Sequence, residues 1–317
     1  MANNSGAQAV WGFGIETTQN TRVAADMFHP FVQESMKENH TPIFDNGIYN
    51  DEPFMRSPVA GAQKPGGQVA LELTPEVCSQ LFFLAMGAVT TTGASAPYTH
   101  EITRDLGALK SFTMHIVRPG LTTLEVWEYI GCMIAGWNIQ VAPAARPTLQ
   151  LDVLANRCDR SATALSPTYP TLNRLSYTHC SLTIAAGAQT FDSLTIGQRT
   201  GVAAENQIQA TNPGSQTVFE AGAGSDFLGS LTVDYTSTTE GFYADQLAGT
   251  TRAMVLTMQV SASASIVIDG DAVFTDDPTP NVSGKGKTKH SLGFRFVNGG
   301  SNPPTITVKS AEATINA

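Results

Sequence analysis

The chain has 317 residues, a formal net charge of −9 and only 14% charged residues. This length allows two domains with separate cores. The acidic balance argues against a protein that grips nucleic acid by neutralising phosphates with a clustered basic face. Few charges and many small residues favour a protein whose surface is largely covered by other subunits.

The chain begins with a strand pattern and then a long irregular segment. Residues 10–16 predict a strand, whereas residues 27–37 fit either a strand or a helix. Residues 39–66 contain four prolines and three glycines, too many for a regular element. This segment is nevertheless apolar, and two interpretations stay open: it covers the core of its own domain, or it is an arm that contacts a neighbouring subunit. The candidate contact residues are Phe44, Ile48, Tyr49, Phe54 and Met55.

A strand and then a helix are predicted next. Residues 67–74 place apolar side chains on alternate positions, as a half-buried strand requires. Residues 75–89 carry apolar side chains at helical spacing. Thr74 can cap this helix, Pro75 suits its first turn, and Glu76 complements its positive end.

The same order of patterns occurs a second time. Residues 229–236 alternate like a strand and lead into a second helical stretch at 238–250, for which residues 236–238 offer caps. Strand patterns at 112–116 and 256–260 follow the two helices, and further strand patterns lie at 134–141 and 148–154. The predicted fold class is mainly β: two tandem duplicated β-sandwich domains, residues 1–156 and 175–317, each with one flanking α-helix and joined by a linker at 157–174.

The sequence contains no recognisable catalytic, cofactor-binding or metal-binding motif. Residues 286–288 resemble the end of a phosphate-binding loop, but Asn281 stands where the leading glycine is required. His179 and Cys180 lack a second ligand pair at zinc-site spacing. An acidic group does not follow the spacing of a calcium loop: Asp269, Asp271, Asp276 and Asp277. We therefore expect no enzyme activity, no cofactor and no metal.

The four cysteines are far apart and form no CxxC pair, which favours reduced and mostly buried thiols. No signal peptide is visible, and the longest apolar stretch, 81–89, is too short to span a bilayer. These features favour a soluble protein in a reducing cytoplasm, with no membrane partner.

Five short segments occur in an order that resembles the tail tube (major tail) proteins of long-tailed bacteriophages. They are Gly-Ile-Glu at 14–16, Leu-Ala-Met-Gly at 84–87, Tyr-Thr-His at 98–100, Ser-Phe-Thr-Met at 111–114 and Tyr-Ile-Gly-Cys-Met at 129–133. The resemblance covers most of residues 10–155. The second half repeats it more weakly and lacks the Tyr-Ile-Gly-Cys segment.

The resemblance implies a structural β-sandwich subunit that joins identical copies into rings. Such rings stack into a tube, through whose lumen genomic DNA passes at infection without specific binding. The protein would be made and assembled in the host cytoplasm and would reside in the virion tail with other tail proteins. Two fused tube domains imply trimeric rings of pseudo-sixfold symmetry, with hexameric rings as the alternative.

Two other functions stay open at this point. One is another tail or baseplate component or a capsid decoration protein, which tube formation by the purified chain would separate from a tube subunit. The other is a glycan-binding β-sandwich module, which would expose aromatic side chains on one sheet face. Trp11, Trp127 and Trp137 lie in strand-like apolar contexts, which favours a core position for all three.

Overall fold

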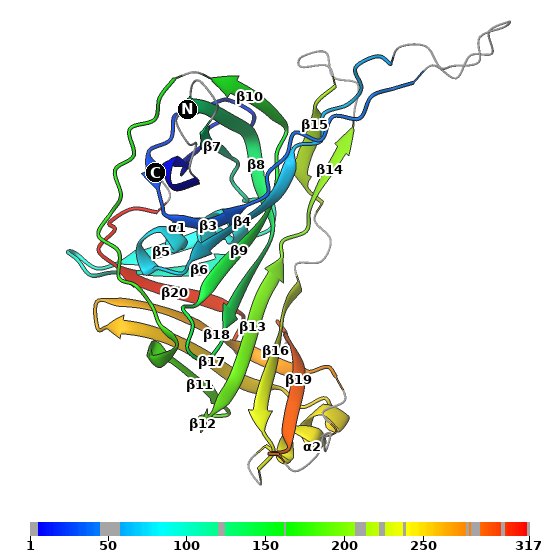
Figure 1. Ribbon diagram of the computed structural model, residues 1–317. Helices are drawn as coiled ribbons and strands as arrows, with labels where there is room; N and C mark the ends of the chain where they lie inside the picture. The colour runs from blue at the N-terminus through cyan, green and yellow to red at the C-terminus, as the bar shows by residue number, and fades with distance from the viewer. Residues whose placement is uncertain are drawn as a thin grey trace, which may run out of the picture.

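The computed structural model describes residues 6–44, 58–119, 124–161, 163–206, 214–221, 226–236, 239–276, 279, 286–298 and 302–315. Within these ranges the fold is mainly β, as predicted, with twenty strands, two α-helices and two short 3-10 helices, Gly6–Gln8 and Tyr177–His179. Figure 1 shows two layers of strands, with an arm projecting at the upper right.

One antiparallel sheet, which we call the central sheet, runs through both halves of the chain (Figure 1). Its strand order is β3–β4–β9–β8–β13–β16–β19–β18. The strands are β3 (Phe31–Glu34), β4 (Gly66–Glu72), β8 (Leu124–Val141), β9 (Thr148–Leu154), β13 (Phe191–Arg199), β16 (Asp226–Asp234), β18 (Ala264–Phe274) and β19 (Lys289–Phe296). The sequence located the strands at 134–141 and 148–154 correctly.

The second layer consists of two smaller sheets. In the first, β2 (Met27–Phe28), β1 (Val10–Ile15), β7 (Phe112–Pro119), the first part of β8 and β10 (Arg157–Ser161) are neighbours. In the second, the order is β12 (Gly187–Gln189), β11 (Cys180–Ile184), β17 (Arg252–Ser261), β18, β20 (Thr305–Ser310), β6 (Tyr98–Arg104) and β5 (Gly87–Thr92). Because β8 and β18 pair with strands of both layers, they hold the layers together.

A separate hairpin is formed by β14 (Val202–Asn206) and β15 (Gln216–Glu220). The arm that contains residues 37–44 and 58–66 is also hairpin-like, because isolated bridges join Lys37 to Gly66, His40 to Gln63 and Ile43 to Val59. The arm lies close to the hairpin, since the backbone nitrogen of Gln63 donates to the carbonyl oxygen of Gly214. The described parts of the predicted irregular segment, 39–44 and 58–66, therefore run side by side away from the core (Figure 1).

The helix α1 (Pro75–Met86) begins where the sequence predicted and ends three residues earlier. Gly87 adopts a left-handed conformation with φ of 97°, which suits a glycine C-cap, and the chain then enters β5. The Thr74 side chain does not cap the helix. Its hydroxyl instead bonds the Nε2 of buried His29 at 3.0 Å, which ties the start of the helix to the β2–β3 turn.

The second helix, α2 (Gly241–Ala248), is shorter than predicted and differs from α1 in its burial. Every residue of α1 is buried, whereas in α2 only Phe242 and Asp245 are. Of the predicted capping residues, Ser237 and Thr238 lie outside the described residues, and Glu240 occupies the N-cap position without a side-chain cap.

The core is continuous between the two halves of the chain. An aromatic cluster crosses the junction: Trp137 of β8 lies 5.2 Å from both Phe82 of α1 and Phe227 of β16, and Phe227 lies 4.9 Å from Phe296 of β19. Trp11 and Trp137 are buried as predicted, whereas Trp127 is only partly buried and packs at the edge of the core. This indole is half-buried because Arg118 and Arg160 cover it, at 4.6 and 4.0 Å from the ring centroid.

Residues 157–174, the predicted linker, include strand β10 and then run in irregular conformation past α1. Leu172 packs against the core, and the backbone and side-chain nitrogens of Asn173 donate to the carboxylate of Glu76 at the start of α1. This covering segment explains why α1 has no exposed face. All four cysteines are free, and Cys78, Cys132 and Cys158 are buried, as the sequence predicted.

Candidate functional surface

Alternation along the central sheet gives it one apolar and one polar face. Leu71, Leu151, Ile139, Leu194 and Leu231 point into the core, so that their neighbours along each strand point the other way. The outward positions form a surface that we call the polar face. Its uncharged polar members are Gln68, Asn138, Gln140, Thr148, Gln150, Ser193, Thr195, Ser230, Thr232 and Ser291.

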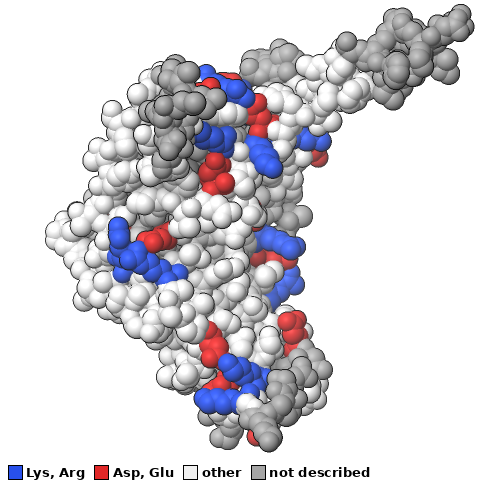
Figure 2. Space-filling model, in the orientation of Figure 1, with Lys and Arg blue, Asp and Glu red and all other residues white. Residues whose placement is uncertain are grey.

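The positive and negative charges on the polar face nearly cancel. Among the described residues they belong to Glu72, Asp152, Asp226, Asp234, Arg199, Lys289 and Arg295. Most are held in ion pairs or hydrogen bonds: Asp226 pairs with Arg295, and the Nζ of Lys289 lies 2.6 Å from the carboxylate of Asp192. In Figure 2 the visible surface is mostly uncharged, and blue groups lie beside red ones.

Two further pairs lie near the ends of strands on this face. The Nζ of Lys287 lies 2.7 Å from the Asp234 carboxylate, and this hydrogen bond lowers the pKa of Asp234. Arg146 donates to both oxygens of Glu72 at 2.7 and 2.9 Å. Both pairs are substantially exposed, so they contribute little to stability. In these pairs the positive charge of Lys287 or Arg146 is neutralised by a carboxylate at hydrogen-bond distance.

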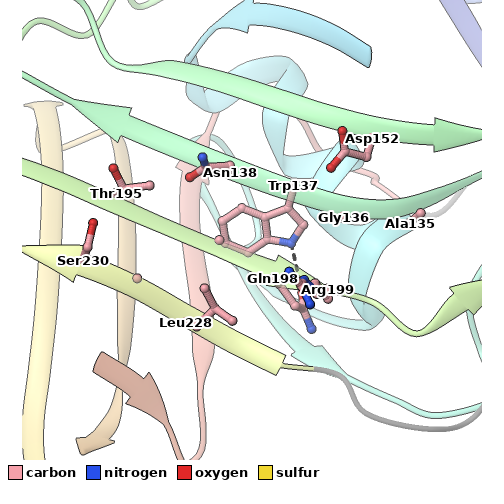
Figure 3. A pocket seen from close by; sticks show the side chains of 12 residues that line it. Ala135, Gly136, Trp137, Asn138, Asp152, Thr195, Gln198, Arg199, Leu228 and Ser230 are labelled. Atoms are coloured by element: carbon pink, nitrogen blue, oxygen red, sulfur yellow. Dashed lines mark hydrogen bonds between the residues drawn. The ribbon is translucent and has the colours of Figure 1, made fainter. Parts of the chain in front are cut away.

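A hollow of about 470 Å³ lies at the middle of the polar face, where β9, β8, β13 and β16 run side by side (Figure 3). Its wall includes Gly136 and Gly197, where the absence of side chains lowers the surface. A Cβ at Gly197 would meet the carbonyl oxygen of Trp137. Behind this surface the Trp137 Nε1 donates to the Oε1 of Gln198 at 2.9 Å. The charged side chains that line the hollow are Asp152 and Arg199, and its lining contains no histidine, cysteine or second carboxylate.

Three of the five sequence segments that resemble tail tube proteins converge on one buried carboxylate. Glu16 accepts hydrogen bonds from the hydroxyls of Ser111 and Thr113 at 2.7 and 2.8 Å, and from the backbone nitrogens of Asn20 and Gly131, both at 2.8 Å. Gly-Ile-Glu, Ser-Phe-Thr-Met and Tyr-Ile-Gly-Cys-Met therefore meet at this point. This network locks β1, β7 and β8 together and has no access to a substrate, since Glu16 is buried.

Only one of the five predicted contact residues falls within the described part of the chain. Phe44 is 51% exposed on the arm, beside Ile43 and Val59, which are also exposed. Ile48, Tyr49, Phe54 and Met55 lie outside the described residues. The described part of the arm thus presents large apolar side chains to solvent, away from the core.

The described side chains among those considered for metal binding have other hydrogen-bond partners or lie apart. His179 accepts a hydrogen bond from the Ser176 backbone nitrogen through Nδ1, as part of a capping box. The Asp269 carboxylate accepts from Asn302 at 2.7 Å, and Asp277 lies outside the described residues. Within the described ranges no group of three or more histidine, cysteine or acidic residues could hold a metal ion. None of the helices described there is long and apolar enough to cross a membrane.

Comparison with known protein families decides between the open functions. The family model for phage tail tube proteins matches residues 6–296. The chain belongs to this family. No curated protein matches the chain.

Family membership makes this a structural protein of the phage tail. It implies oligomeric stacking with other tail proteins and a place in the virion tail. A structural tail tube family is not typically enzymatic. The match includes both halves of the chain, whereas the sequence resemblance had its specific segments in residues 10–155 only.

Sequence reasoning missed the polar face as a functional surface. A signal was present, because residues at alternate positions of 136–140, 148–152 and 193–197 are glycines, hydroxyls, amides and one aspartate rather than a mixture of lysine and glutamate. Ordinary solvent-facing strand positions carry more charge, so this uncharged pattern distinguishes the face. The continuity of the face depends on strand pairing between residues far apart in sequence.

Proposed function

We propose that this protein is the tail tube subunit of a long-tailed phage, which self-assembles into stacked rings whose lumen conducts DNA at infection. The observation that carries the proposal is the central sheet. It extends through both halves of the chain, packs one face on the core, and leaves the other face polar and uncovered by any described element. A sheet of this kind can continue from chain to chain around a channel.

The second part of the proposal is that the chain contains two fused tail-tube-like domains, 1–156 and 175–317, joined at 157–174. Six strand pairings support it, because each occurs once in each half of the chain. Five of the first-half pairs lie within 1–156, and β8–β10 uses a strand at the start of the linker. The pairs β1–β7, β7–β8, β8–β10, β8–β9, β4–β9 and β3–β4 correspond to β11–β17, β17–β18, β18–β20, β18–β19, β16–β19 and β13–β16. The helices occupy equivalent places, since α1 follows β4 and α2 follows β16.

Two domains per chain favour three chains in each ring. The domain junction inside the chain then repeats between chains, and six domains surround the axis with pseudo-sixfold symmetry. A hexameric ring of this chain would contain twelve domains and a much wider lumen. The trimer is therefore our preferred state, and the hexamer is the alternative.

We further propose that the polar face lines the lumen. Amides, hydroxyls and glycines present no fixed cation to the phosphates of DNA, and the basic groups of the face are largely paired with carboxylates. The attraction that gives non-specific DNA binding is thereby removed without creating a strongly repulsive wall. The net negative charge of the chain then lies mainly on the outer surface and the rims of the ring rather than in the lumen.

The arm is proposed to contact an adjacent ring or subunit through the segment from Phe44 to Met55. Its described base supports this, because Ile43, Phe44 and Val59 expose apolar surface far from the core. Deleting residues 44–55 should leave a folded, soluble chain that no longer polymerises. Leu106→Ser, which removes an equally exposed apolar side chain elsewhere, is the matched control. Tubes of unchanged length after the deletion would contradict this role.

Negative-stain electron microscopy of the purified full chain tests the proposal as a whole. We expect to see rings or tubes. The mass of single rings in solution should correspond to three chains. A chain that stays monomeric under all assembly conditions, or that decorates capsids without forming tubes, would contradict the tube function. Rings of six chains would leave the tube function standing and overturn the trimer.

A further inference from the structure

We infer that neighbouring chains in the ring join by pairing β3 of one chain with the end of β18 of the next. This inference rests on the proposed ring and on the proposed duplication. The occupant of each open strand edge is thus a second copy of this chain. At one junction within the chain every strand edge is paired. At two other edges, on β3 and at the end of β18, no described strand is paired.

The complete junction lies between the two halves of the chain. The strand β7 pairs with β8 only as far as Cys132, and beyond that point Gly136–Val141 of β8 pair with Arg199–Leu194 of β13. The opposite edge of this part of β8 is occupied by β9. The second half therefore attaches to the first at the position on β8 that β7 leaves vacant.

At the equivalent position in the second half, the described part of the chain provides no such partner. The strand β17 pairs with β18 only as far as Ala272, and β19 occupies the other edge from Ala272 onward. Val273 and Phe274 pair with Arg295 and Phe294 of β19, and no described strand lies on their second edge. By the correspondence of β18 with β8, this is the place where a first strand of another domain would attach.

The complementary edge belongs to β3, which corresponds to β13. Within the described residues β3 pairs with β4 alone, whereas β13 pairs with both β16 and β8. Val32 on this short strand is 61% exposed. An open strand edge with exposed apolar residues promotes association unless it is covered. Among the described residues, β3 and the last two residues of β18 thus each have a strand on one edge only.

Strand direction is consistent with head-to-tail joining. All seven neighbouring pairs in the eight-stranded order are antiparallel, so β18 runs opposite to β3. A β3 strand from the next chain, placed beside β18 in the same orientation of the sheet, therefore continues the antiparallel alternation. The two edges are different surfaces, which makes the contact heterologous, and a heterologous contact generates a closed ring when its rotation closes.

The helices supply a second, independent observation. Helix α1 lies at the junction within the chain, where it contacts β18 and β20 of the second half, and all of its residues are buried. Helix α2 packs on the end of β18 through Phe242 and Phe274, whose rings are 5.0 Å apart. Its opposite side exposes Tyr243 and Leu247, the latter by 68%. A first half from the next chain, attached at the end of β18, would cover these side chains as the second half covers α1.

Cysteine cross-linking of the full chain tests this contact. Four double variants combine Val32→Cys or Gln33→Cys with Val273→Cys or Thr275→Cys, in a background where the half-buried Cys180 is replaced by serine. After mild oxidation of assembled protein we expect at least one pair to yield covalent trimers on a non-reducing gel. Tyr169→Cys combined with Val273→Cys is the control, because Tyr169 is exposed on the segment that covers α1, and it should give no ladder.

The same samples, viewed by electron microscopy, separate failure of the contact from failure of the function. Rings without cross-links in all four variants would overturn the β3–β18 contact and leave the tube function intact. Cross-linked hexamers would keep the contact and overturn the trimer. Absence of rings from the parent protein would overturn both.

A charge-insertion variant gives a second test. Val32→Glu combined with Leu247→Glu should unfold at the same denaturant concentration as the parent monomer, since both side chains are exposed. These like charges would lie at the same contact between chains, so we expect ring formation to fall at least tenfold in this variant. Val32→Glu combined with Leu106→Glu should lose less, because Leu106 lies away from α2. Rings formed by the first variant as readily as by the parent protein would overturn the inference.

Discussion

Replacing Glu16 with glutamine should destabilise the protein although the two side chains have the same shape. Each carboxylate oxygen accepts two hydrogen bonds: Oε1 from Thr113 and Gly131, and Oε2 from Ser111 and Asn20. The amide nitrogen of glutamine must replace one of these oxygens, and it can only donate. At that position a hydroxyl can rotate and accept, but a backbone N–H cannot.

The structure sets the size of the effect. In either orientation of the amide, one backbone N–H, of Asn20 or Gly131, faces another donor, which costs about 1–3 kcal/mol in a buried site. The remaining bonds lose their charge assistance. We expect Glu16→Gln to reduce the free energy of unfolding by about 2 kcal/mol. Glu16→Ala leaves all four donors without this acceptor and should cost about 4 kcal/mol. Asn20 and Gly131 both have φ near +65°, and the carboxylate holds these two backbone conformations in place.

Equilibrium denaturation followed by tryptophan fluorescence measures these losses under conditions where the chain is not assembled. Glu125→Gln is the matched control, because Glu125 is exposed on β8 and its change should stay within about 0.5 kcal/mol. If Glu16→Gln shifted the midpoint no more than Glu125→Gln, the network would not stabilise the fold, and our account of why these sequence segments occur together would be refuted.

Three further outcomes are expected. Phe227→Ala should reduce the free energy of unfolding by about 3–5 kcal/mol, because it empties the aromatic cluster between the halves; exposed Tyr177→Ala should change the denaturation midpoint far less, and equal effects would contradict the role of the cluster. Burial lowers the pKa of His29 to about 4, below its unfolded value near 6.5, so the unfolded chain takes up a proton first. The free energy of unfolding should therefore fall by up to about 3 kcal/mol as pH decreases from 6.5 to 4. Urea titrations at several pH values should show a weaker pH dependence for His29→Gln, and an unchanged pH dependence would contradict this role of His29. Asp226→Asn should release Arg295 on the polar face, so that assembled protein retains DNA in a filter assay. With three such contacts per ring, the affinity for DNA should drop about 40-fold between 50 and 200 mM salt. If the variant passed DNA like the parent, the polar face would not be the lumen wall.

The start of α1 could be predicted because its determinants are local. Thr74, Pro75 and Glu76 lie next to the apolar repeat that they introduce, and the helix begins at Pro75. Its end was misplaced because residues 87–89, Gly-Ala-Val, continue the apolar pattern but belong to β5, which pairs with β6. The use of the Thr74 hydroxyl also depended on a distant residue, since His29 is 45 positions away.

Strand positions were predictable from alternation, but strand partners were not. The pattern at 134–141 identified the end of β8, yet nothing local showed that β8 begins at Leu124 and passes from one layer to the other. The polar face and its ion pairs depend on contacts such as Asp226 with Arg295, which are 69 positions apart. Periodicity specifies which face a side chain occupies, whereas the identity of the surface depends on non-local pairing.

The weak second copy of the sequence pattern has a physical reason in the Glu16 network. The segments that made the first half recognisable supply the carboxylate, its two hydroxyl donors and Gly131, a set that must be kept together. The second half has no Tyr-Ile-Gly-Cys segment. Strand pairing is less demanding, because any alternating apolar sequence can satisfy it. The arrangement of strands therefore repeats where the residues do not.

The two junctions of the proposed ring are unequal, which bears on why two domains would be fused. Within the chain the halves are joined twice, by β8 with β13 and by β20 with β6 of the β5–β6 hairpin. That hairpin lies between α1 and β7, whereas α2 is followed almost directly by β17, so the second half has no equivalent hairpin to offer the next chain. The proposed contact between chains therefore relies on β3, the end of β18 and the exposed side of α2. In the proposed ring, fusion puts the larger junction inside each subunit and leaves the smaller junction between subunits, an order in which each subunit folds before the ring closes.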